Sequence, residues 1–271
     1  MKPKVSIVIV HYAKKKVLFD SIKSIYASCS KVTFEIVVVD NDEVKSINKH
    51  LKKNFPKVKY VSAPENLGYG RGNNLGVENA EGKYVFILNP DTVVQKNSIE
   101  TLVNFLEKNK KVGIVAPTLL DEKSRAYPLQ GTKRLTPVRA IFALSFLNKL
   151  FPGNPISKEY WMLGIDRTKA FEADVVPGSA FMIKKSLFKK LSGFDENFFL
   201  YFEETDLCKR VSEAGYKLFI LPDAKIIHYW GVSTSSSDKM KKIFEKSRFY
   251  YFKKNFGIFN ALLVESFCKN K

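Results

Sequence analysis

Two β-branched runs near the amino terminus constrain the fold of this chain more than any other feature. Residues 5–10 read Val-Ser-Ile-Val-Ile-Val, and residues 34–39 read Phe-Glu-Ile-Val-Val-Val, with helical periodicity at residues 17–26 between them. Short apolar runs of this kind are typical of strands that are buried on both faces of a sheet. Strand, helix and strand at this spacing form a βαβ unit, so the two strands should be parallel and their carboxyl ends should share one edge.

Further alternation of strand and helix follows along the chain and predicts an α/β fold, with a Rossmann-like, mainly parallel central sheet flanked by helices and a C-terminal helical tail. The expected later strands lie at residues 58–62, 84–88, 113–116, 218–220 and 225–227. Regularity weakens between residues 121 and 174, although residues 137–151 have helical periodicity. We expect one domain over 1–235, with halves at 1–116 and 117–235, and a basic, aromatic helical tail over 236–271; the resemblance described below implies that this domain is catalytic, that its first half binds a nucleotide and that its second half binds an acceptor.

Composition narrows the class of partner and the cellular setting. The 45 basic and 27 acidic residues give a formal charge of +18, which favours phosphorylated or anionic partners. The chain has neither the aromatic and arginine platform nor the recognition helix of a nucleic-acid binder, so no nucleic-acid partner is expected. Three cysteines without paired spacing, no signal-peptide core and no long apolar run predict a cytoplasmic protein that does not cross a membrane.

Polar residues follow several expected strands at the points where these strands end. Proline cannot donate to a sheet ladder, so the strand at 84–88 must stop before Pro90 and the next residue must lie in a turn. Open α/β sheets bind their ligands at the carboxyl ends of the strands. The residues in this position are His11, Tyr12, Asp40, Asn41, Asn89, Asp91 and His228.

Two other segments contribute to the same candidate site. A loop rich in glycine and asparagine, with Asn66, Gly68, Gly72 and Asn74, opens a helix and would let the backbone approach a nucleotide, although an ordinary capped turn has the same composition. The helix expected from residue 203 begins with three acids among its first four residues. Acids at a helix start favour the helix dipole, but three of them exceed that need.

Taken together, four segments resemble glycosyltransferases of family 2, which have the GT-A fold, over about residues 5–229. The resemblance is to the rhamnosyltransferase-like branch, which decorates bacterial surface polysaccharides. The matching segments are VSIVIVHY, EIVVVDN, NLGYGRGNNLGVENAEGKYVFILNPD and PGSAFMIKKSLFKKLSGFDENFFLYFEETDLCKRVSEAGYKLFILPDAKIIHYWG. The resemblance implies inverting transfer of a sugar from a nucleotide-diphosphate donor to a hydroxyl of a glycan or a lipid-linked glycan.

A divalent cation and a carboxylate base follow from the same resemblance. Asp91 is the implied ligand of Mn²⁺ or Mg²⁺, and His228 occupies the place of a second ligand. Asn89 stands where many family members have the first aspartate of Asp-x-Asp, and it would bind a ribose or sugar hydroxyl. The general base is Glu204, with Glu203 as the alternative, because the family usually has Glu-Asp at this place.

The nucleotide and sugar pockets complete the expected site. His11, Tyr12, Asp40 and Asn41 would hold the base and ribose, and an Asp40 carboxylate that accepts the pyrimidine N3–H fits a UDP- or dTDP-sugar such as dTDP-rhamnose. Gly178 and Ser179 would line the sugar or acceptor pocket. Trp161 and Trp230 are alternative stacking platforms for a sugar, although a buried structural role is the simpler interpretation of a tryptophan.

The tail admits two interpretations, and the function has alternatives as well. The basic, aromatic segment 239–254 is expected either to lie on an anionic membrane, at the inner face of the cytoplasmic membrane, or to pack on the catalytic domain. Residues 135–151 admit the same choice, or they could form part of a lid that binds the acceptor. Two other functions remain open. One is an inactive glycosyltransferase-like binding subunit of a polysaccharide assembly complex. The other is a sugar-phosphate nucleotidyltransferase, which would carry a glycine- and arginine-rich loop where this chain has His11 and Tyr12.

Overall fold

The computed structural model describes residues 2–28, 31–229 and 238–268. Trp230 and the expected domain boundary at 235 lie outside the described residues. The amino-terminal βαβ unit is present as β1 (Val5–His11), α1 (Lys15–Ser28) and β2 (Phe34–Asp40). β1 and β2 are parallel and in continuous register from Val5 opposite Phe34 to His11 opposite Asp40.

The central sheet is parallel in its first half and mixed in its second half. Its order is β3-β2-β1-β4-β8-β6-β9-β5, with β7 on β9. The strands β3, β2, β1 and β4 are parallel to one another, whereas β8 runs antiparallel to both β4 and β6. The bounds are β3 (Lys59–Ser62), β4 (Tyr84–Leu88), β5 (Thr92–Val94), β6 (Val112–Leu120), β7 (Phe171–Glu172), β8 (Ala180–Lys184) and β9 (Lys217–His228).

The two short strands expected at 218–220 and 225–227 are one strand, β9. Its pairing with β6 shifts from Leu221 opposite Pro117 to Lys225 opposite Thr118, so residues 222–224 bulge from the ladder. Pro222 lies in this bulge and has no N–H to donate, which explains why the sequence pattern breaks there while the strand continues.

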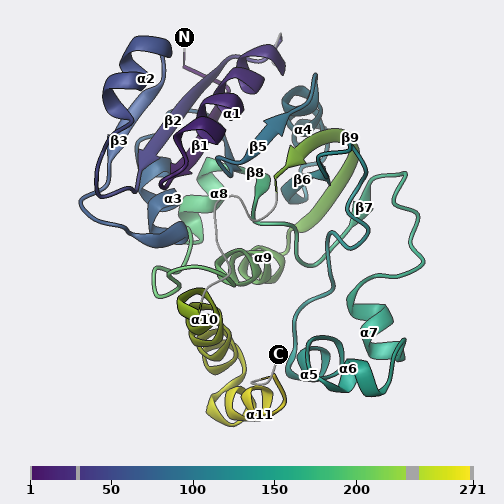
Figure 1. Cartoon of the computed structure of the whole chain (residues 1–271). Coiled ribbons are helices and arrows are strands. Elements are labelled where there is room, and N and C mark those ends of the chain that lie inside the picture. The colour runs from purple at the N-terminus through teal and green to yellow at the C-terminus, as the bar shows by residue number, and fades with distance from the viewer. Residues whose placement is uncertain (1, 29–30, 230–237, 269–271) are drawn as a thin grey trace.

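Helices cover both faces of the sheet because its strands are apolar on both sides. Ile7 of β1 packs in a core with α1 and α4 (Ser98–Lys108), while its neighbour Val8 packs in a core on the other face with α8 (Lys185–Lys190) and α9 (Glu203–Glu213). α3 (Gly68–Glu78) also covers this second face, and α2 (Asn48–Asn54) joins the first. The result is a helix–sheet–helix sandwich (Figure 1).

A separate helical layer lies beside the sheet, next to α9 (Figure 1). It consists of α5 (Pro137–Leu144), α6 (Leu147–Leu150), α7 (Pro155–Tyr160), α10 (Asp238–Phe256) and α11 (Ile258–Cys268). Gly257, with φ +86°, separates α10 from α11, so the expected tail is two helices. Tyr251 and Phe252 of α10 are fully buried against α5 and the segment before α9, so α10 follows the packing interpretation. No helix among the described residues is long and apolar enough to cross a membrane.

Candidate active site

The carboxyl ends of the strands surround a cavity of about 330 Å³. Five residues expected at the site line this cavity: Tyr12, Asn41, Asn66, Gly68 and Asn89. They are joined by residues that sequence reasoning missed, which are Val10, Tyr69, Pro90, Phe199, Leu200, Lys239, Met240 and Ile243. The last three come from the first turns of α10, so the tail forms part of the wall.

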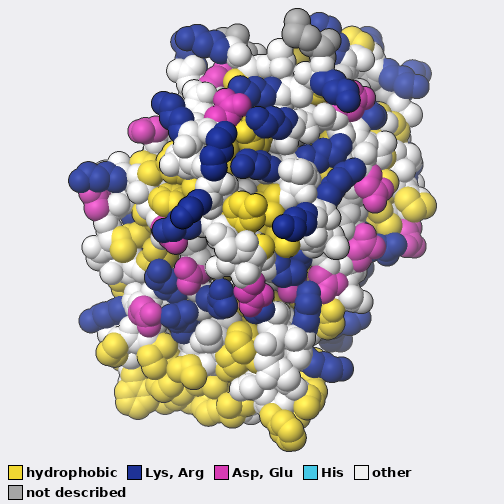
Figure 2. Space-filling model, turned by 180° about the vertical axis from the view of Figure 1, so that it is seen from behind, with side chains coloured by type: hydrophobic (Ala, Val, Ile, Leu, Met, Phe, Trp, Pro, Cys, Tyr) yellow, Lys and Arg dark blue, Asp and Glu magenta, His cyan; other side chains and the backbone are white. Residues whose placement is uncertain are grey.

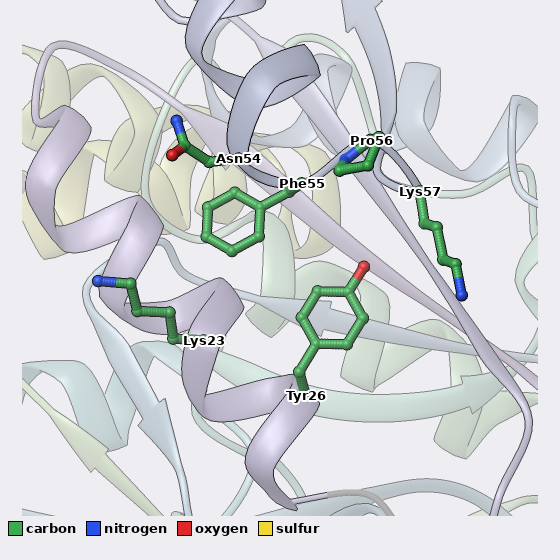
Figure 3. A pocket seen from close by; sticks show the side chains of 6 residues that line it. All are labelled: Lys23, Tyr26, Asn54, Phe55, Pro56 and Lys57. Atoms are coloured by element: carbon green, nitrogen blue, oxygen red, sulfur yellow. The ribbon is translucent and has the colours of Figure 1, made fainter.

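A second hollow, of about 420 Å³, lies between α1 and α2 (Figure 3). Tyr26 and Phe55 form its apolar surface, with ring centroids 6.4 Å apart, and the other lining residues are Lys23, Asn54, Pro56 and Lys57. None of these six carries a carboxylate or an imidazole. The chemistry expected from the sequence is therefore concentrated at the strand edge.

Asn41 organises the glycine-rich loop. Its Nδ2 donates to Asn66 Oδ1 at 3.0 Å and to the Gly68 carbonyl at 3.1 Å, and its Oδ1 accepts the Leu67 N–H at 3.0 Å. Gly68 has φ +76°, and a Cβ there would lie 2.2 Å from the Phe199 carbonyl oxygen, so only glycine fits. Asn41 thus acts on the wall of the cavity by holding the loop in shape.

Gly72 and Asn74 serve packing instead of lining the cavity. A Cβ on Gly72 would lie 3.0 Å from Val10, which shows how closely α3 approaches β1. Asn74 Nδ2 donates to the Phe194 carbonyl at 2.9 Å, and its Oδ1 accepts the Phe194 N–H at 2.9 Å. The Asn74 side chain therefore fixes the turn that precedes α9, and the structure does not bring it to the cavity.

His11 and Asp40 end the neighbouring strands β1 and β2, and each is directly next in sequence to a residue that lines the cavity, although neither lines it itself. His11 is 1% exposed, and in the part of the chain that the structure describes neither of its ring nitrogens has a hydrogen-bond partner. Burial lowers the pKa of His11 and outweighs the opposing charges of Asp40 and Asp42, so the ring is neutral near pH 7. The Asp40 carboxylate accepts from Tyr60 Oη at 2.9 Å and from the Asp42 N–H at 3.2 Å. A neutral imidazole with two unused nitrogens is suited to a nucleotide donor or acceptor group.

Asp91 and His228, the predicted cation ligands, are brought together from distant parts of the chain. Antiparallel pairing places Thr92 opposite His228, which leaves His228 Nε2 3.4 Å from Asp91 Oδ1. Both side chains are almost fully buried. Two neighbouring ligands of one ion, each about 2.1 Å from it, lie about 3 Å apart, so the pair fits a divalent cation. Across the described residues no cluster of three or more His, Cys, Asp or Glu forms a larger cation site.

Asn89 lies next to this pair in sequence and lines the cavity. Its N–H donates to the Ser179 carbonyl at 2.8 Å, which ties the end of β4 to the residues before β8. Its side-chain Oδ1 is buried and has no hydrogen-bond partner among the described residues. The predicted hydrogen bond from this oxygen to a ribose or sugar hydroxyl remains a prediction.

Glu203 and Glu204 begin α9 after Phe202, whose left-handed φ of +70° turns the chain into the helix. Glu203 is 4% exposed, and no described residue forms a hydrogen bond with its Oε2. Burial, followed by the charge of Glu204, raises the pKa of Glu203 well above its ordinary value, and burial also raises the pKa of Glu204. Raised carboxyl pKa values are typical of groups that exchange protons in catalysis.

Tyr69 connects the separate parts of the site. Its hydroxyl donates to the Gly178 carbonyl, and a Cβ on Gly178 would lie 3.0 Å from Cγ of Glu204. The pKa of Tyr69 is raised well above its ordinary value, first by burial and then by the charges of Glu203, Glu204 and Asp91. The glycine loop, the Gly178 segment, the acid pair and the cation ligand thus belong to one site.

The third acid of the helix start, Asp206, has a structural partner set. Its side chain is fully buried, and it pairs with Arg210 Nε and with Lys254 Nζ at 2.7 Å each. Asp206 therefore contributes to the docking of α10, whereas Glu203 and Glu204 remain the candidate catalytic acids. Trp161 packs edge-on against Tyr160 at 4.8 Å in the helical layer and is not among the residues that line the cavity.

The sheet and its flanking helices have the GT-A fold. The structure is similar to GalNAc-T7 crystallised with UDP, GalNAc and Mn²⁺, with a TM-score of 0.65 and 16% identity over 98% of this chain and 55% of that one. It is also similar to S. aureus TarS, with a TM-score of 0.59 and 16% identity over 98% of this chain and 43% of that one. The chain spans about half the length of these two structures.

The chain belongs to glycosyl transferase family 2, whose model matches residues 6–192. It is 27% identical to the rhamnosyltransferase WbbL of Escherichia coli K12 over 72% of this chain and 73% of that protein. It is 24% identical to the N-acetylglucosaminyl-diphospho-decaprenol L-rhamnosyltransferase of Mycobacterium tuberculosis over 73% of this chain and 67% of that protein. The fold and family expected from the sequence are confirmed.

Proposed function

We propose that this chain transfers a sugar, with inversion, from a UDP- or dTDP-linked donor to a hydroxyl of a glycan or lipid-linked glycan in the synthesis of a bacterial surface polysaccharide. The observation that carries the proposal is the convergence of Asp91 and His228, 3.4 Å apart, with the buried Glu203–Glu204 pair around Tyr69. The names of the relatives, two of them rhamnosyltransferases, support dTDP-rhamnose as the first donor to test.

The proposed donor site binds the base, the diphosphate and a hydroxyl of the donor with different side chains in and next to the cavity. Tyr12 is half exposed at the cavity wall and offers a ring for stacking on the base, while His11 and Asp40 end the neighbouring strands β1 and β2. Lys239 lines the cavity from α10 and supplies a positive charge for the diphosphate. Asn89 Oδ1 accepts a hydrogen bond from a ribose or sugar hydroxyl.

Asp91 and His228 would hold Mn²⁺ or Mg²⁺, and the bound cation would neutralise the charge that develops on the leaving diphosphate. A carboxylate oxygen and an imidazole nitrogen in one site favour manganese somewhat over magnesium. The diphosphate and water would complete the ligand set, because the protein contributes two ligands.

Glu204 is the proposed general base. It takes the proton from the acceptor hydroxyl while that oxygen forms a bond to the anomeric carbon and the bond from this carbon to the diphosphate breaks. Glu204 packs on Gly178, beside Ser179, and these two residues form the proposed acceptor side of the site. Glu203, the more deeply buried of the two, is the alternative base, and its charge contributes to the raised pKa of Tyr69.

The nucleotide site is tested by isothermal titration with UDP, dTDP and GDP, each with and without Mn²⁺. We expect Mn²⁺-dependent binding of UDP or dTDP that weakens at least about tenfold in Asp91→Asn, since a ligand charge is lost. The exposed Asp223→Asn is the matched control and should bind as the wild type does. Absence of nucleotide binding under every condition would refute the transferase proposal.

The base is tested by turnover of dTDP-rhamnose and UDP-sugars with wild type, Glu204→Gln and Glu203→Gln. We expect Glu204→Gln to lower kcat at least about hundredfold with little change in nucleotide affinity. Glu203→Gln should lower it less. A larger loss of kcat in Glu203→Gln than in Glu204→Gln would make Glu203 the base. Tight nucleotide binding by the wild type without any turnover would instead favour the inactive binding subunit.

A further inference from the structure

The outer surface of the helical layer is apolar over two segments that are far apart in the sequence. Figure 2 shows hydrophobic side chains gathered at one end of the molecule, with basic and acidic side chains above them. On α11 the exposed residues are Ile258, Phe259, Leu262 and Leu263, and on and beside α5, α6 and α7 they are Val138, Phe146, Leu150, Phe151 and Leu163. We call these nine residues the apolar end.

The two segments of the apolar end are in contact. α11 packs on α5, and the ring of Phe146 stacks on that of Phe267 with centroids 5.9 Å apart. Ala261 and Val264 bury the inner face of α11 in the third core, while Phe259 on the outer face is 85% exposed. An exposed apolar face of this kind ordinarily marks a surface that another surface covers.

The charges that remain free beside the apolar end are positive. Each acid of α5, α6, α7 and α11 is already paired: Glu159 with Arg139 and Glu265 with Arg248, both at 2.7 Å. Lys149 of α6, Lys158 of α7 and Lys253 at the end of α10 are exposed, and no described residue forms an ion pair with any of them. An apolar surface rimmed by free lysines complements a surface that is apolar inside and negative at its border.

From this arrangement we propose that the apolar end docks on the headgroup region of an anionic phospholipid bilayer. Phe259, Leu262 and Leu150 enter the boundary between headgroups and acyl chains, and the lysines contact the lipid phosphates. A second copy of this chain is a poorer partner, because it would bring two sets of free lysines together. The membrane surface thus lies on α11 and α6, not on the buried aromatics of α10.

Vesicle flotation of the full chain tests the proposal, with phosphatidylcholine vesicles that either contain or lack phosphatidylglycerol, at physiological ionic strength. We expect binding to the phosphatidylglycerol vesicles to be at least about tenfold stronger than to the neutral vesicles. The double variant Phe259→Ser/Leu262→Ser should lower this binding at least about tenfold. Lys149→Glu/Lys253→Glu should remove the preference for anionic lipid.

The control replaces exposed apolar residues elsewhere. Val44→Ser/Leu129→Ser removes two such side chains from other parts of the surface and should bind vesicles as the wild type does. Absence of wild-type binding, or equal binding by the Phe259→Ser/Leu262→Ser variant, overturns the proposal. A concentration-dependent dimer that this variant abolishes, without vesicle binding, would assign the surface to a second copy instead. The vesicle assay contains no nucleotide, so its result does not depend on whether the proposed donor site is correct.

Discussion

Glu203 and Glu204 place two like charges side by side in a buried site, which opposes folding. Burial raises the pKa of both carboxyls, and the charge of Glu204 adds to the effect on Glu203. A neutral side chain at either position would make the folded chain more stable, so we expect the two acids to be retained for catalysis at the expense of stability. The cost in stability can be measured by replacing Glu203 alone.

Glu203→Gln should stabilise the chain, and increasingly so as the pH rises. An unfolded glutamate titrates near pH 4.3, whereas the folded carboxyl keeps its proton to a higher pH. Between these two pKa values the folded state holds the extra proton, so the free energy of unfolding of the wild type falls as pH rises. Glutamine stays neutral, and we expect its melting temperature to exceed that of the wild type by about 3 °C at pH 8.

Thermal unfolding from pH 4 to pH 8 checks this prediction. The difference between variant and wild type should vanish near pH 4, where both side chains are neutral. Glu122→Gln, at an exposed loop position, should give no difference at any pH. A Glu203→Gln variant that is less stable than the wild type at pH 8 would contradict the assignment of a strained, buried acid.

At this scale the sequence predicts the residues that end strands better than those that shape the site. Asp91 and His228 meet because each belongs to a strand end, and strand ends are visible as apolar runs. The role of Tyr69 depends on the Gly178 carbonyl, and that of Asn74 on the Phe194 backbone, each more than 100 residues away. Such partners are set by the tertiary fold and leave no local pattern.

Among the elements, α10 has the most connections to the site. Its first turns line the cavity, Ser247 Oγ donates to the Leu200 carbonyl at 2.8 Å, and Tyr250 Oη donates to Asp195 Oδ2 at 2.9 Å. Lys254 Nζ then lies 2.7 Å from both Asp195 and Asp206. α10 therefore holds both the turn before α9, the helix that begins with the proposed base, and the helix itself.

Lys254→Met should loosen this attachment. Burial alone would raise the pKa of Asp195, but hydrogen bonds from Lys254, Asn197 and Tyr250 lower it to about 2. The variant leaves Asp206 buried with Arg210 as its remaining ion-pair partner. Because the Lys254 side chain is 29% exposed, we expect a loss of about 2 kcal/mol in the free energy of unfolding, below the range for fully buried pairs.

Urea unfolding at pH 7 and at low pH measures this effect. A lowered carboxyl pKa adds stability above the unfolded value of about 3.9, and that stability is lost as pH falls. The difference between Lys254→Met and wild type should therefore shrink below about pH 4. Lys253→Met, the exposed neighbour, should match the wild type; equal losses in both variants would refute a specific role for Lys254.

The elements that sequence periodicity predicted well are those that depend on one local pattern. β1, α1, β2 and β4 match their expected positions within about two residues, because strands buried on both faces and amphipathic helices are encoded locally. The sequence predicts two strands where the structure has β9, because the bulge at Pro222 interrupts the apolar pattern. Only the pairing with β6 shows that the strand is continuous. The mixed half of the sheet likewise depends on the antiparallel placement of β8, which no local pattern specifies.

In the molecule as a whole, the helical layer joins parts that the sequence presents as separate. Its core combines Ile141 of α5, Phe198 and Phe202 before α9, and Tyr251 of α10 with Val264 of α11. Tyr251 Oη also donates to the Leu135 carbonyl at 3.1 Å. The chain after residue 235 thus completes a core that begins with residue 135, and it also supplies Lys239 to the cavity.

Ending the chain after residue 235 should therefore damage both stability and nucleotide binding. Without α10 and α11, the buried side chains of Phe198, Phe202 and Ile141 would face water, at a cost of about 1.5–3 kcal/mol for each fully buried side chain that becomes exposed. We expect aggregation, or a melting temperature lowered by more than about 10 °C. Thermal unfolding and nucleotide titration of the purified 1–235 chain provide the measurement.

A second truncation, after residue 257, separates the two roles of the tail. It keeps α10, with Lys239 at the cavity and Lys254 on Asp206, and removes α11 with its outer apolar face. Nucleotide affinity should stay within about threefold of the wild type, since no residue of α11 lines the cavity. Vesicle binding should be lost. If instead the 1–235 chain kept the melting temperature and nucleotide affinity of the full chain, residues 1–235 would be an independent domain and α10 would be an accessory to it.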